Sequence, residues 1–169
     1  VYKRQRGNRA DIDAAVTFGR QAFSGQWGHL NALERGRLLS LWAEAILTHQ
    51  EELAQIESND TGKAITQARA DAVALSRFIA LCGDAAYTVN GQTIREQEGY
   101  TVRALREPLG VTGHIIAWSY PMQIFGRSVG AALAAGNTCV VKPAEDASLS
   151  LLRIAALAAE VGFPAGTLN

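Results

Sequence analysis

The sequence has no net charge, few cysteines and prolines, and no long hydrophobic run. Its 16 lysine and arginine residues balance 16 aspartate and glutamate residues, so it lacks the positive surface that nucleic acids and anionic membranes attract. No apolar stretch reaches the length of a membrane span, and the N-terminus has no apolar signal core. We therefore expect a protein that binds neither nucleic acid nor membrane.

The two cysteines, Cys82 and Cys139, are far apart in the sequence, and no metal-ligand spacing surrounds them. Two isolated cysteines make neither a disulfide framework nor a metal site. They fit a reducing compartment, so we expect the protein in the cytoplasm. Cys82 lies on a hydrophobic helical stripe and Cys139 in an apolar run, which predicts that both are buried.

What the chain does contain is enough hydrophobic sequence for a core. Hydrophobic residues make up 48% and charged residues 19% of the 169 positions, the balance of a globular protein. Sixteen glycines beside four prolines favour close-packed α/β structure over disorder. Residues 1–5 (VYKRQ) fit no pattern that follows and can be back-translated as a transposon adapter. We expect a non-native tail there; an ordinary basic tail is the alternative.

Residues 8–89 show the spacing of apolar residues that is typical of helices. Asp11 can cap a first helix to residue 23 that buries Ile12 and Phe23. Asn31 and Glu34 form a capping-box pattern for a second helix to about residue 49, with an apolar face of Leu38, Leu41, Trp42, Ala45 and Ile46. A third, short helix ends at the breaker in residues 59–62.

The fourth predicted helix has the most regular pattern of the chain. Its apolar residues alternate spacings of three and four over six turns: Ile65, Ala68, Ala72, Leu75, Ile79, Cys82 and Ala86. The pair Asn90-Gly91 then ends the helical period. Residues 100–106 alternate as an extended segment too polar for burial on both sides, so residues 90–108 predict an edge strand or a protruding arm.

The last third of the chain alternates strands and helices. Residues 111–116 and 138–141 read as short buried strands. Pro121 opens a helix to about residue 135, and a final helix starts at Ser148 or Ser150. These lengths imply parallel strands with a right-handed crossover. We predict an α/β fold: a Rossmann-like parallel sheet with helices on both faces in residues 109–169, preceded by an all-helical N-terminal layer, as an incomplete domain.

In a parallel sheet the ligand site lies beyond the carboxyl ends of the strands. Residues 117–121 (AWSYP) and 142–145 (KPAE) occupy that position, and both contain polar or aromatic groups that a turn does not need. Residues 110–121 (GVTGHIIAWSYP), 132–145 (ALAAGNTCVVKPAE) and 159–164 (AEVGFP) resemble the aldehyde dehydrogenase superfamily. Residues 57–63 (ESNDTGK) resemble its acidic turn with Thr-Gly-Lys, and the likeness covers nearly everything after residue 10.

The resemblance implies a cofactor site on these two segments. Ile115, Ile116, Ala117 and Trp118 are then expected along the nicotinamide side of the cleft. Lys142, Ala144 and Glu145 are expected at the adenosine ribose, where a carboxylate accepts two hydroxyl protons and repels a 2′-phosphate. The expected cofactor is therefore NAD, with NADP not excluded. Without the resemblance, Lys142 and Glu145 could also be a solvated pair after a strand.

Two positions depart from the family pattern. Ala117 stands where the family has proline, and Ser119 where it has the asparagine whose amide helps to bind the oxyanion. A serine hydroxyl is shorter and offers one donor, and the loss of an oxyanion donor costs on the order of a hundredfold in rate. Ser119 replaces the asparagine imperfectly, or the site is impaired, or the sequence carries an error; these alternatives stay open.

The family's nucleophilic cysteine, its general-base glutamate and its glycine-rich pyrophosphate turn are expected C-terminal to Asn169. Cys139 is no substitute because it has no basic partner in its apolar run, and no histidine has ligand or triad spacing. Gly126 and Gly130 predict a close helix–sheet contact. No metal site is expected.

The implied full-length protein oxidises an aldehyde to an acid with NAD(P)⁺ through a cysteine thiohemiacetal, as a homodimer or homotetramer, whereas this chain alone is expected to be inactive. The rival interpretations are a non-catalytic nucleotide-binding or structural member of the same fold, and an acyl-phosphate or acyl-CoA reductase.

Overall fold

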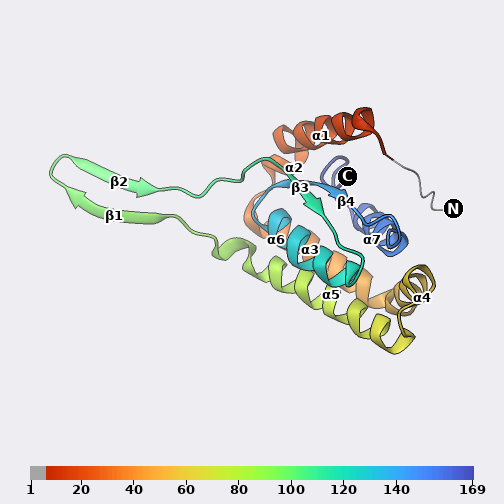
Figure 1. Cartoon of the computed structure of the whole chain (residues 1–169). Helices are drawn as coiled ribbons and strands as arrows, with labels where there is room; N and C mark the ends of the chain where they lie inside the picture. Colours follow the sequence, from red (N-terminus) through yellow and green to blue (C-terminus); the bar gives the residue numbers. More distant parts are fainter. Residues whose placement is uncertain (1–6) are drawn as a thin grey trace.

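The computed structural model describes residues 7–169, apart from the side chains of residues 96 and 97. The expected non-native tail at residues 1–5 lies outside the described residues. Figure 1 shows a body of packed helices and short strands from which one hairpin projects. The elements follow in the order α1 (Arg9–Ser24), α2 (Gln26–His29), α3 (Ala32–Thr48), α4 (Gln50–Thr61), α5 (Ile65–Ala85), η1 (Ala86–Thr88), β1 (Gln92–Gln97), β2 (Tyr100–Ala104), β3 (Val111–Ile115), α6 (Pro121–Ala134), β4 (Thr138–Lys142) and α7 (Leu149–Glu160).

The first helix starts earlier than its sequence pattern predicts. Asn8 caps α1, and Asp11 is the N3 residue that accepts a hydrogen bond from the Asn8 backbone N–H at 2.8 Å. The prediction that Asp11 caps the helix is therefore wrong by three positions, because Asn8 completes a capping box with it. Ile12, expected to be buried, is 57% exposed, since α1 packs mainly through Gly19 and Ala22.

The second predicted helix is confirmed with its capping box. The Asn31 side chain accepts from the Glu34 backbone N–H, and the Glu34 side chain accepts from that of Asn31. The expected burial of Trp42 and Ile46 is also confirmed, whereas Leu41 is 39% exposed and Leu39 is fully buried instead. The buried face of α3 is therefore rotated relative to the predicted one.

Helix α5 packs against three neighbouring helices, α3, α4 and α6. Its predicted stripe is confirmed at Ala68, Ala72, Leu75, Ile79 and Ala86, which are all buried, and Cys82 is half-buried. Gly62, in the left-handed conformation at φ 77°, ends α4 before it, as expected of a helix-ending glycine.

Glycines let α5 approach two of its neighbours closely. A Cβ on Gly36 of α3 would lie 2.7 Å from the Gly83 carbonyl oxygen of α5. A Cβ on Gly126 of α6 would lie 2.9 Å from Leu75 Cδ1, and one on Gly130 would lie 3.0 Å from Ile79 Cδ1. The predicted helix–sheet contact of Gly126 and Gly130 is thus wrong: the helix that they approach is α5.

The arm is a two-stranded antiparallel hairpin of β1 and β2 that projects from the body (Figure 1). Residues 100–106, predicted as an edge strand or a protruding arm, contain β2, and every residue of β2 is exposed. The pairing strand β1 also lies within the range 90–108 given for the arm or edge strand, although its own alternation is short and polar.

The parallel pairing predicted in the last third is confirmed. Strands β3 and β4 pair in parallel from Val111 opposite Thr138 to Ile115 opposite Lys142. A further extended segment pairs with β4, because the Cys139 N–H donates to the Thr167 carbonyl and the Asn169 N–H to the Cys139 carbonyl, both at 2.9 Å. Strand β4 therefore lies between β3 and this C-terminal segment.

The two faces of the β3–β4 pair are covered by different helices. Helix α1 lies over one face, where Gly19 approaches Val111 and Thr138. Helix α6 lies under the other, where Ser128 bonds to His114. The predicted α/β class, with helices on both faces of a parallel sheet after a helical N-terminal layer, is confirmed.

Aromatic side chains join the helical layer to the α/β part. The Trp42 indole donates to the Ile154 carbonyl of α7, and the Trp27 indole to the Asn137 carbonyl before β4, both at 3.0 Å. The Phe163 ring lies 5.6 Å from that of Trp27 and 5.2 Å from that of Trp42. Each tryptophan is buried with its N–H paired, so these contacts fix the start of β4 and the axis of α7.

Candidate cofactor site

The carboxyl ends of β3 and β4 form an open surface. Ile115 and Lys142 are register partners, and paired residues of neighbouring strands point to the same face of a sheet. Ile115 is 85% exposed and Lys142 is exposed. On the same face of β3, a Cβ added at Gly113 would meet no atom within 4 Å. An apolar and a cationic side chain therefore lie together beside uncovered backbone.

The segment after β3 turns outward before α6 begins. The Ile116 N–H donates to the Lys142 carbonyl at 3.0 Å, and the Ile116 side chain is 2% exposed in the core. Ala117, Trp118 and Ser119 are exposed, Trp118 at 67%. The structure thus brings Ile115 and Trp118 to the surface expected for the nicotinamide side. Ile116 does not present its side chain there, and only its backbone can contribute.

The segment after β4 supplies the polar groups expected at a ribose. Pro143 and Ala144 are half-buried, whereas Glu145 is exposed. In the described part of the chain, neither Lys142 nor Glu145 forms an ion pair. Both side chains therefore face solvent, as the solvated-pair alternative also expects. An ammonium and a carboxylate that are both exposed can serve ribose hydroxyls as donor and acceptor.

Neither cysteine has the surroundings of a nucleophile. Cys139 is fully buried, and burial raises the pKa of its thiol to about 12, although its Sγ lies 3.6 Å from Thr112 Oγ1. Burial also raises the pKa of Cys82. Since the thiolate is the reactive form, both side chains act as small hydrophobic groups.

His114 belongs to a polar chain between β3 and α6. Its Nε2 lies 2.9 Å from Thr112 Oγ1 and its Nδ1 lies 2.6 Å from Ser128 Oγ. Because Thr112 Oγ1 donates to the Thr138 carbonyl, Nε2 donates to Thr112 and Nδ1 accepts from Ser128. Burial lowers the pKa of His114. Among the residues that the structure describes, no carboxylate is bonded to the ring, so the contacts join strand to helix rather than form a triad.

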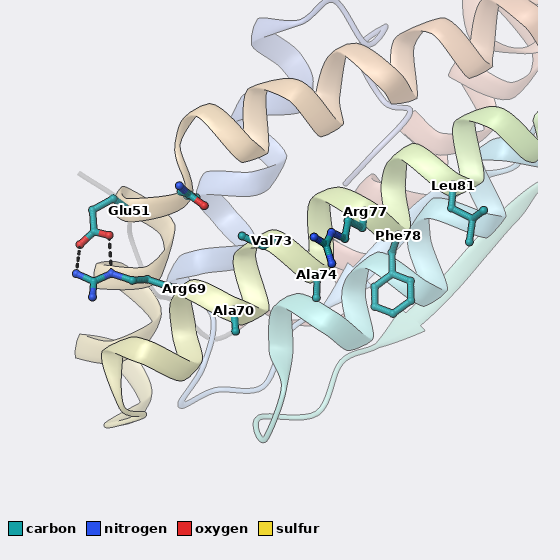
Figure 2. Close-up of a pocket in the computed structure, with 9 residues that line it drawn as sticks. Glu51, Arg69, Ala70, Val73, Ala74, Arg77, Phe78 and Leu81 are labelled. Atoms are coloured by element: carbon teal, nitrogen blue, oxygen red, sulfur yellow. Dashed lines mark hydrogen bonds and ion pairs between the residues drawn. The ribbon is translucent and has the colours of Figure 1, made fainter.

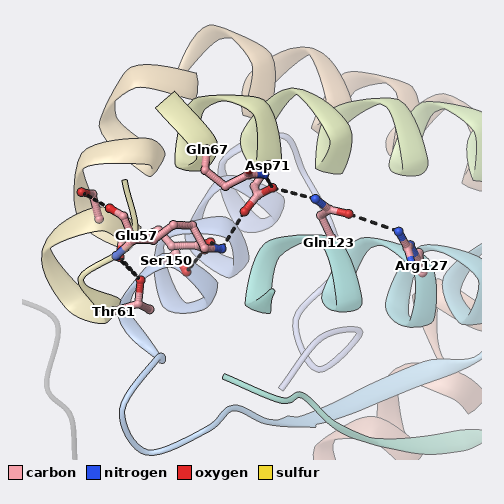
Figure 3. A network of polar contacts seen from close by, with 9 residues as sticks. Glu57, Thr61, Gln67, Asp71, Gln123, Arg127 and Ser150 are labelled. Carbon is pink, nitrogen blue, oxygen red and sulfur yellow. Dashed lines mark hydrogen bonds and ion pairs between the residues drawn. The ribbon is translucent and has the colours of Figure 1, made fainter. Parts of the chain in front are cut away.

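A buried polar network, which sequence reasoning missed, joins helices α4, α5, α6 and α7 (Figure 3). Lys63 Nζ donates to Glu57 Oε1 and to Asp71 Oδ2, each at 2.6 Å, and both carboxylate side chains are fully buried. The available signal was the acidic Thr-Gly-Lys turn at residues 57–63. Buried charges cost free energy unless they are paired and hydrogen-bonded. A lysine that follows acidic residues in one short turn could therefore have suggested a buried ion pair.

Opposing effects set the protonation of this network. Burial raises the pKa of Glu57, and the hydrogen bond from Lys63 reduces that rise. Burial acts to lower the pKa of Lys63, but the hydrogen bonds to Asp71 and Glu57 outweigh it and leave that pKa raised. Lys63 is therefore held as the ammonium at neutral pH.

One hollow of 630 Å³ lies away from the strands, on the outer side of α5 (Figure 2). An exposed ion pair closes one end, where Arg69 Nε lies 2.7 Å from Glu51 Oε2. The wall is mostly alkyl and aromatic: Gln50, Glu51, Arg69, Ala70, Val73, Ala74, Arg77, Phe78 and Leu81. The hollow is lined by no residue of the segments after β3 (residues 117–121) and β4 (residues 142–145), so it is not part of the candidate site.

The described residues 7–169 contain neither a cluster of metal-ligating side chains nor a membrane-spanning helix. No three His, Cys, Asp or Glu side chains of this region are grouped closely enough to hold a metal ion. None of its helices is both long and apolar enough to cross a membrane.

The chain is similar to known proteins over its whole length. The sequence model of the aldehyde dehydrogenase family matches residues 1–169. This chain belongs to the aldehyde dehydrogenase family. Hydroxyisobutyraldehyde dehydrogenase of Mycolicibacterium austroafricanum is 45% identical over 164 residues, which are 97% of this chain and 32% of that protein.

Solved structures of this family show the same fold. A Burkholderia cenocepacia protein assigned to the aldehyde dehydrogenases is 60% identical, with a TM-score of 0.96 over 97% of this chain and 35% of that one. PnpE of Pseudomonas sp. WBC-3, solved in complex with nicotinamide adenine dinucleotide, is 42% identical, with a TM-score of 0.92 over 95% of this chain and 33% of that one. The chain thus spans about a third of the length of these family members.

Proposed function

We propose that the full-length protein containing these residues oxidises an aldehyde to a carboxylic acid with NAD(P)⁺, through a thiohemiacetal on a cysteine outside this chain. The observation that carries the proposal is the shared open face of Ile115 and Lys142 at the carboxyl ends of β3 and β4, where α/β sheets bind nucleotides. Family membership supplies the reaction class.

Two segments of this chain contact different halves of the cofactor. Ile115, Ala117 and Trp118, with the Ile116 backbone, line the nicotinamide side. Lys142, Ala144 and Glu145 hold the adenosine ribose. A nicotinamide cofactor held by these residues would supply the acceptor for the hydride of the thiohemiacetal carbon. The exposed apolar and charged groups on one open face fit such a ligand, which has an aromatic and a polyhydroxyl half.

Ser119 stands at the oxyanion position of this proposal. It is exposed and follows Trp118 directly, so its hydroxyl can face the same cleft. Its donor stabilises the oxygen that becomes negative when the thiolate attacks, and a donor there acts mainly on the rate.

NAD is the favoured cofactor because the Glu145 carboxylate repels a 2′-phosphate. NADP stays an alternative because the exposed Lys142 ammonium can bind a 2′-phosphate. Besides the cofactor and the water that cleaves the thioester, the proposal requires only an aldehyde. The reducing environment that suits two unpaired cysteines favours the cytoplasm.

The proposed assembly is a homodimer or homotetramer. The projecting hairpin supports it, because Ile94 is 50% and Tyr100 is 74% exposed on a two-stranded sheet with free edges. A two-stranded hairpin is marginally stable by itself in water, so a second subunit against it adds the burial that it lacks.

The test is a steady-state assay of the purified full-length protein with a panel of aldehydes and NAD⁺, quantifying acid and reduced cofactor. The proposal expects equal amounts of both products. A non-catalytic member, which Ser119 alone favours, binds NAD⁺ in calorimetry without forming either product. An acyl-phosphate or acyl-CoA reductase, assayed in the oxidative direction, forms reduced cofactor together with an acyl phosphate or acyl-CoA in place of the acid, and only when phosphate or coenzyme A is supplied. Either of these last two results refutes the proposal.

A further inference from the structure

We propose that Lys63 is a positioning residue for the cofactor and oxyanion loops, acting through a buried network that reaches the helix after each loop. The inference rests on the proposed function of those loops. Its evidence is the set of contacts that join Lys63 to two buried carboxylates and these carboxylates to α6 and α7 (Figure 3).

The first branch leads to the loop after β3. Lys63 Nζ lies 4.7 Å from the centroid of the Tyr120 ring, a cation–π contact with the residue that follows Ser119. Asp71, bonded to Lys63, also accepts a 2.6 Å hydrogen bond from Gln123 Nε2 in the first turn of α6. Two contacts from one buried centre therefore fix both sides of Pro121.

The second branch leads to the loop after β4. Glu57, bonded to Lys63, accepts a 3.1 Å hydrogen bond from Ser150 Oγ in the first turn of α7. Asp60, on the same helix as Glu57, accepts from the Leu149 backbone N–H at 3.0 Å. Ser148, the N-cap position, makes no side-chain cap. The end of α4 thus supplies the cap of α7 and fixes where the Lys142–Glu145 segment must finish.

Burial makes this network a rigid support. The Lys63 side chain is 12% exposed, and those of Glu57 and Asp71 are fully buried. In such surroundings hydrogen bonds are stronger than in water and a broken one is costly, so the three groups allow few alternative geometries. A displacement of about 1 Å at a reacting group can cost on the order of a hundredfold in rate.

The experiment compares four variants of the full-length enzyme. Lys63→Met removes the ammonium and keeps the alkyl length. Tyr120→Leu removes the ring face but leaves the buried charges paired, and Tyr120→Phe keeps the ring face. Arg69→Met is the matched control, because it removes a cation from an exposed ion pair elsewhere on α5.

Three quantities are measured for each variant: kcat per titrated active site, KM for NAD⁺, and the acrylamide quenching of Trp118 fluorescence, isolated by subtracting the matching Trp118→Phe protein. Lys63→Met is expected to lower kcat about tenfold or more, to raise KM for NAD⁺ several-fold, and to change Trp118 quenching. Tyr120→Leu is expected to lower kcat with a smaller change in KM, because the second branch stays intact. Tyr120→Phe and Arg69→Met should match the wild type.

A purely structural role gives a different result. In that case Lys63→Met lowers the melting temperature and the fraction of titratable sites, but kcat per site, KM and Trp118 quenching stay as in the wild type; that result overturns the proposal. If Lys63→Met does not fold, the Tyr120 pair decides, and equal kcat for Tyr120→Leu and Tyr120→Phe overturns it.

The measurements distinguish a failure of the proposed function from a failure of the positioning role of Lys63. A wild-type protein without aldehyde oxidation refutes that function, while calorimetric NAD⁺ binding and Trp118 quenching still report on the two loops. If Lys63→Met then alters both, the positioning role stands without the activity; if it alters neither, both proposals fail.

Discussion

Ile115 and Lys142 are paired residues of parallel strands, and the Lys142 carbonyl also accepts the N–H of Ile116 at 3.0 Å. The last hydrogen bond of the strand pair therefore lies directly under the point where the two loops separate. An apolar group and a cation are held together at that point by backbone pairing, whatever the loops beyond them do. This arrangement underlies the predictions for the cofactor site.

Residues 1–169 alone should show no aldehyde oxidation with NAD⁺. Neither of the two thiols is activated, since burial raises the pKa of Cys82 and raises that of Cys139 to about 12. The measurement is the formation of reduced cofactor over a buffer blank, with a Cys139→Ala chain as the control. Turnover that disappears in the control would show that our reading of Cys139 is wrong.

Glu145→Gln in the full-length protein should weaken the preference for NAD⁺ over NADP⁺. The amide keeps one acceptor for the ribose but no longer repels a 2′-phosphate, so the ratio of the two dissociation constants should shift about tenfold, or ~1.4 kcal/mol, toward NADP⁺. Calorimetry with both cofactors measures the ratio. Glu44→Gln, an exposed carboxylate of α3, should leave it unchanged, and an unchanged ratio in Glu145→Gln removes Glu145 from the ribose.

Ser119→Asn in the full-length protein should raise kcat. The amide restores reach and donor geometry where charge develops on attack, whereas ground-state aldehyde binding changes less. An increase of about tenfold to a hundredfold fits the loss of a single oxyanion donor. Single-turnover hydride-transfer rates are the measurement. Equal rates in both proteins would mean that residue 119 does not contact the oxyanion, and a lower rate would mean that the site has adapted to serine.

Gly36→Ala should destabilise the helical layer. The new Cβ would lie 2.7 Å from the Gly83 carbonyl oxygen, and a backbone atom cannot turn aside as a side chain can. Even after the helix-propensity gain of about 1 kcal/mol, we expect a loss of ~1–3 kcal/mol in the free energy of unfolding. Denaturant unfolding of the chain measures it. Gly113→Ala is the control, since its Cβ meets nothing within 4 Å; similar losses in both would argue against close α3–α5 contact.

Stability should fall as the pH drops below about 6.5 through His114. Burial lowers the pKa of His114 from the ordinary 6.5, so the unfolded chain binds the proton more readily than the folded one as the pH falls from 6.5 toward the lower folded pKa. Above 6.5 this contribution is constant.

The measurement is denaturant unfolding of the wild type and His114→Gln over that pH range. The variant should lose less stability at low pH. Glu57, whose pKa is raised, contributes with the opposite sign in both proteins, so it cancels in the difference. Parallel curves for the two proteins would contradict the prediction.

Much of the fold follows from local sequence. The capping box of Asn31 and Glu34, the stripe from Ala68 to Ile79, Pro121 at the start of α6 and the parallel strands were all predictable, because each depends on residues close together in the chain. The same holds for the two loops at the carboxyl edge. Parallel strands must end on one side of the sheet, so a strand–helix–strand pattern brings Ile115 and Lys142 together.

Other features depended on which elements face each other in three dimensions. Ile12 and Leu41 were expected in the core and are exposed, because a helical period locates an apolar stripe but not the neighbour that covers it. Gly126 approaches a helix rather than the sheet for the same reason. The contacts of Lys63 with Asp71 and Tyr120 join three segments that are separate in the sequence. Only tertiary packing decides whether a charged side chain meets water or a partner.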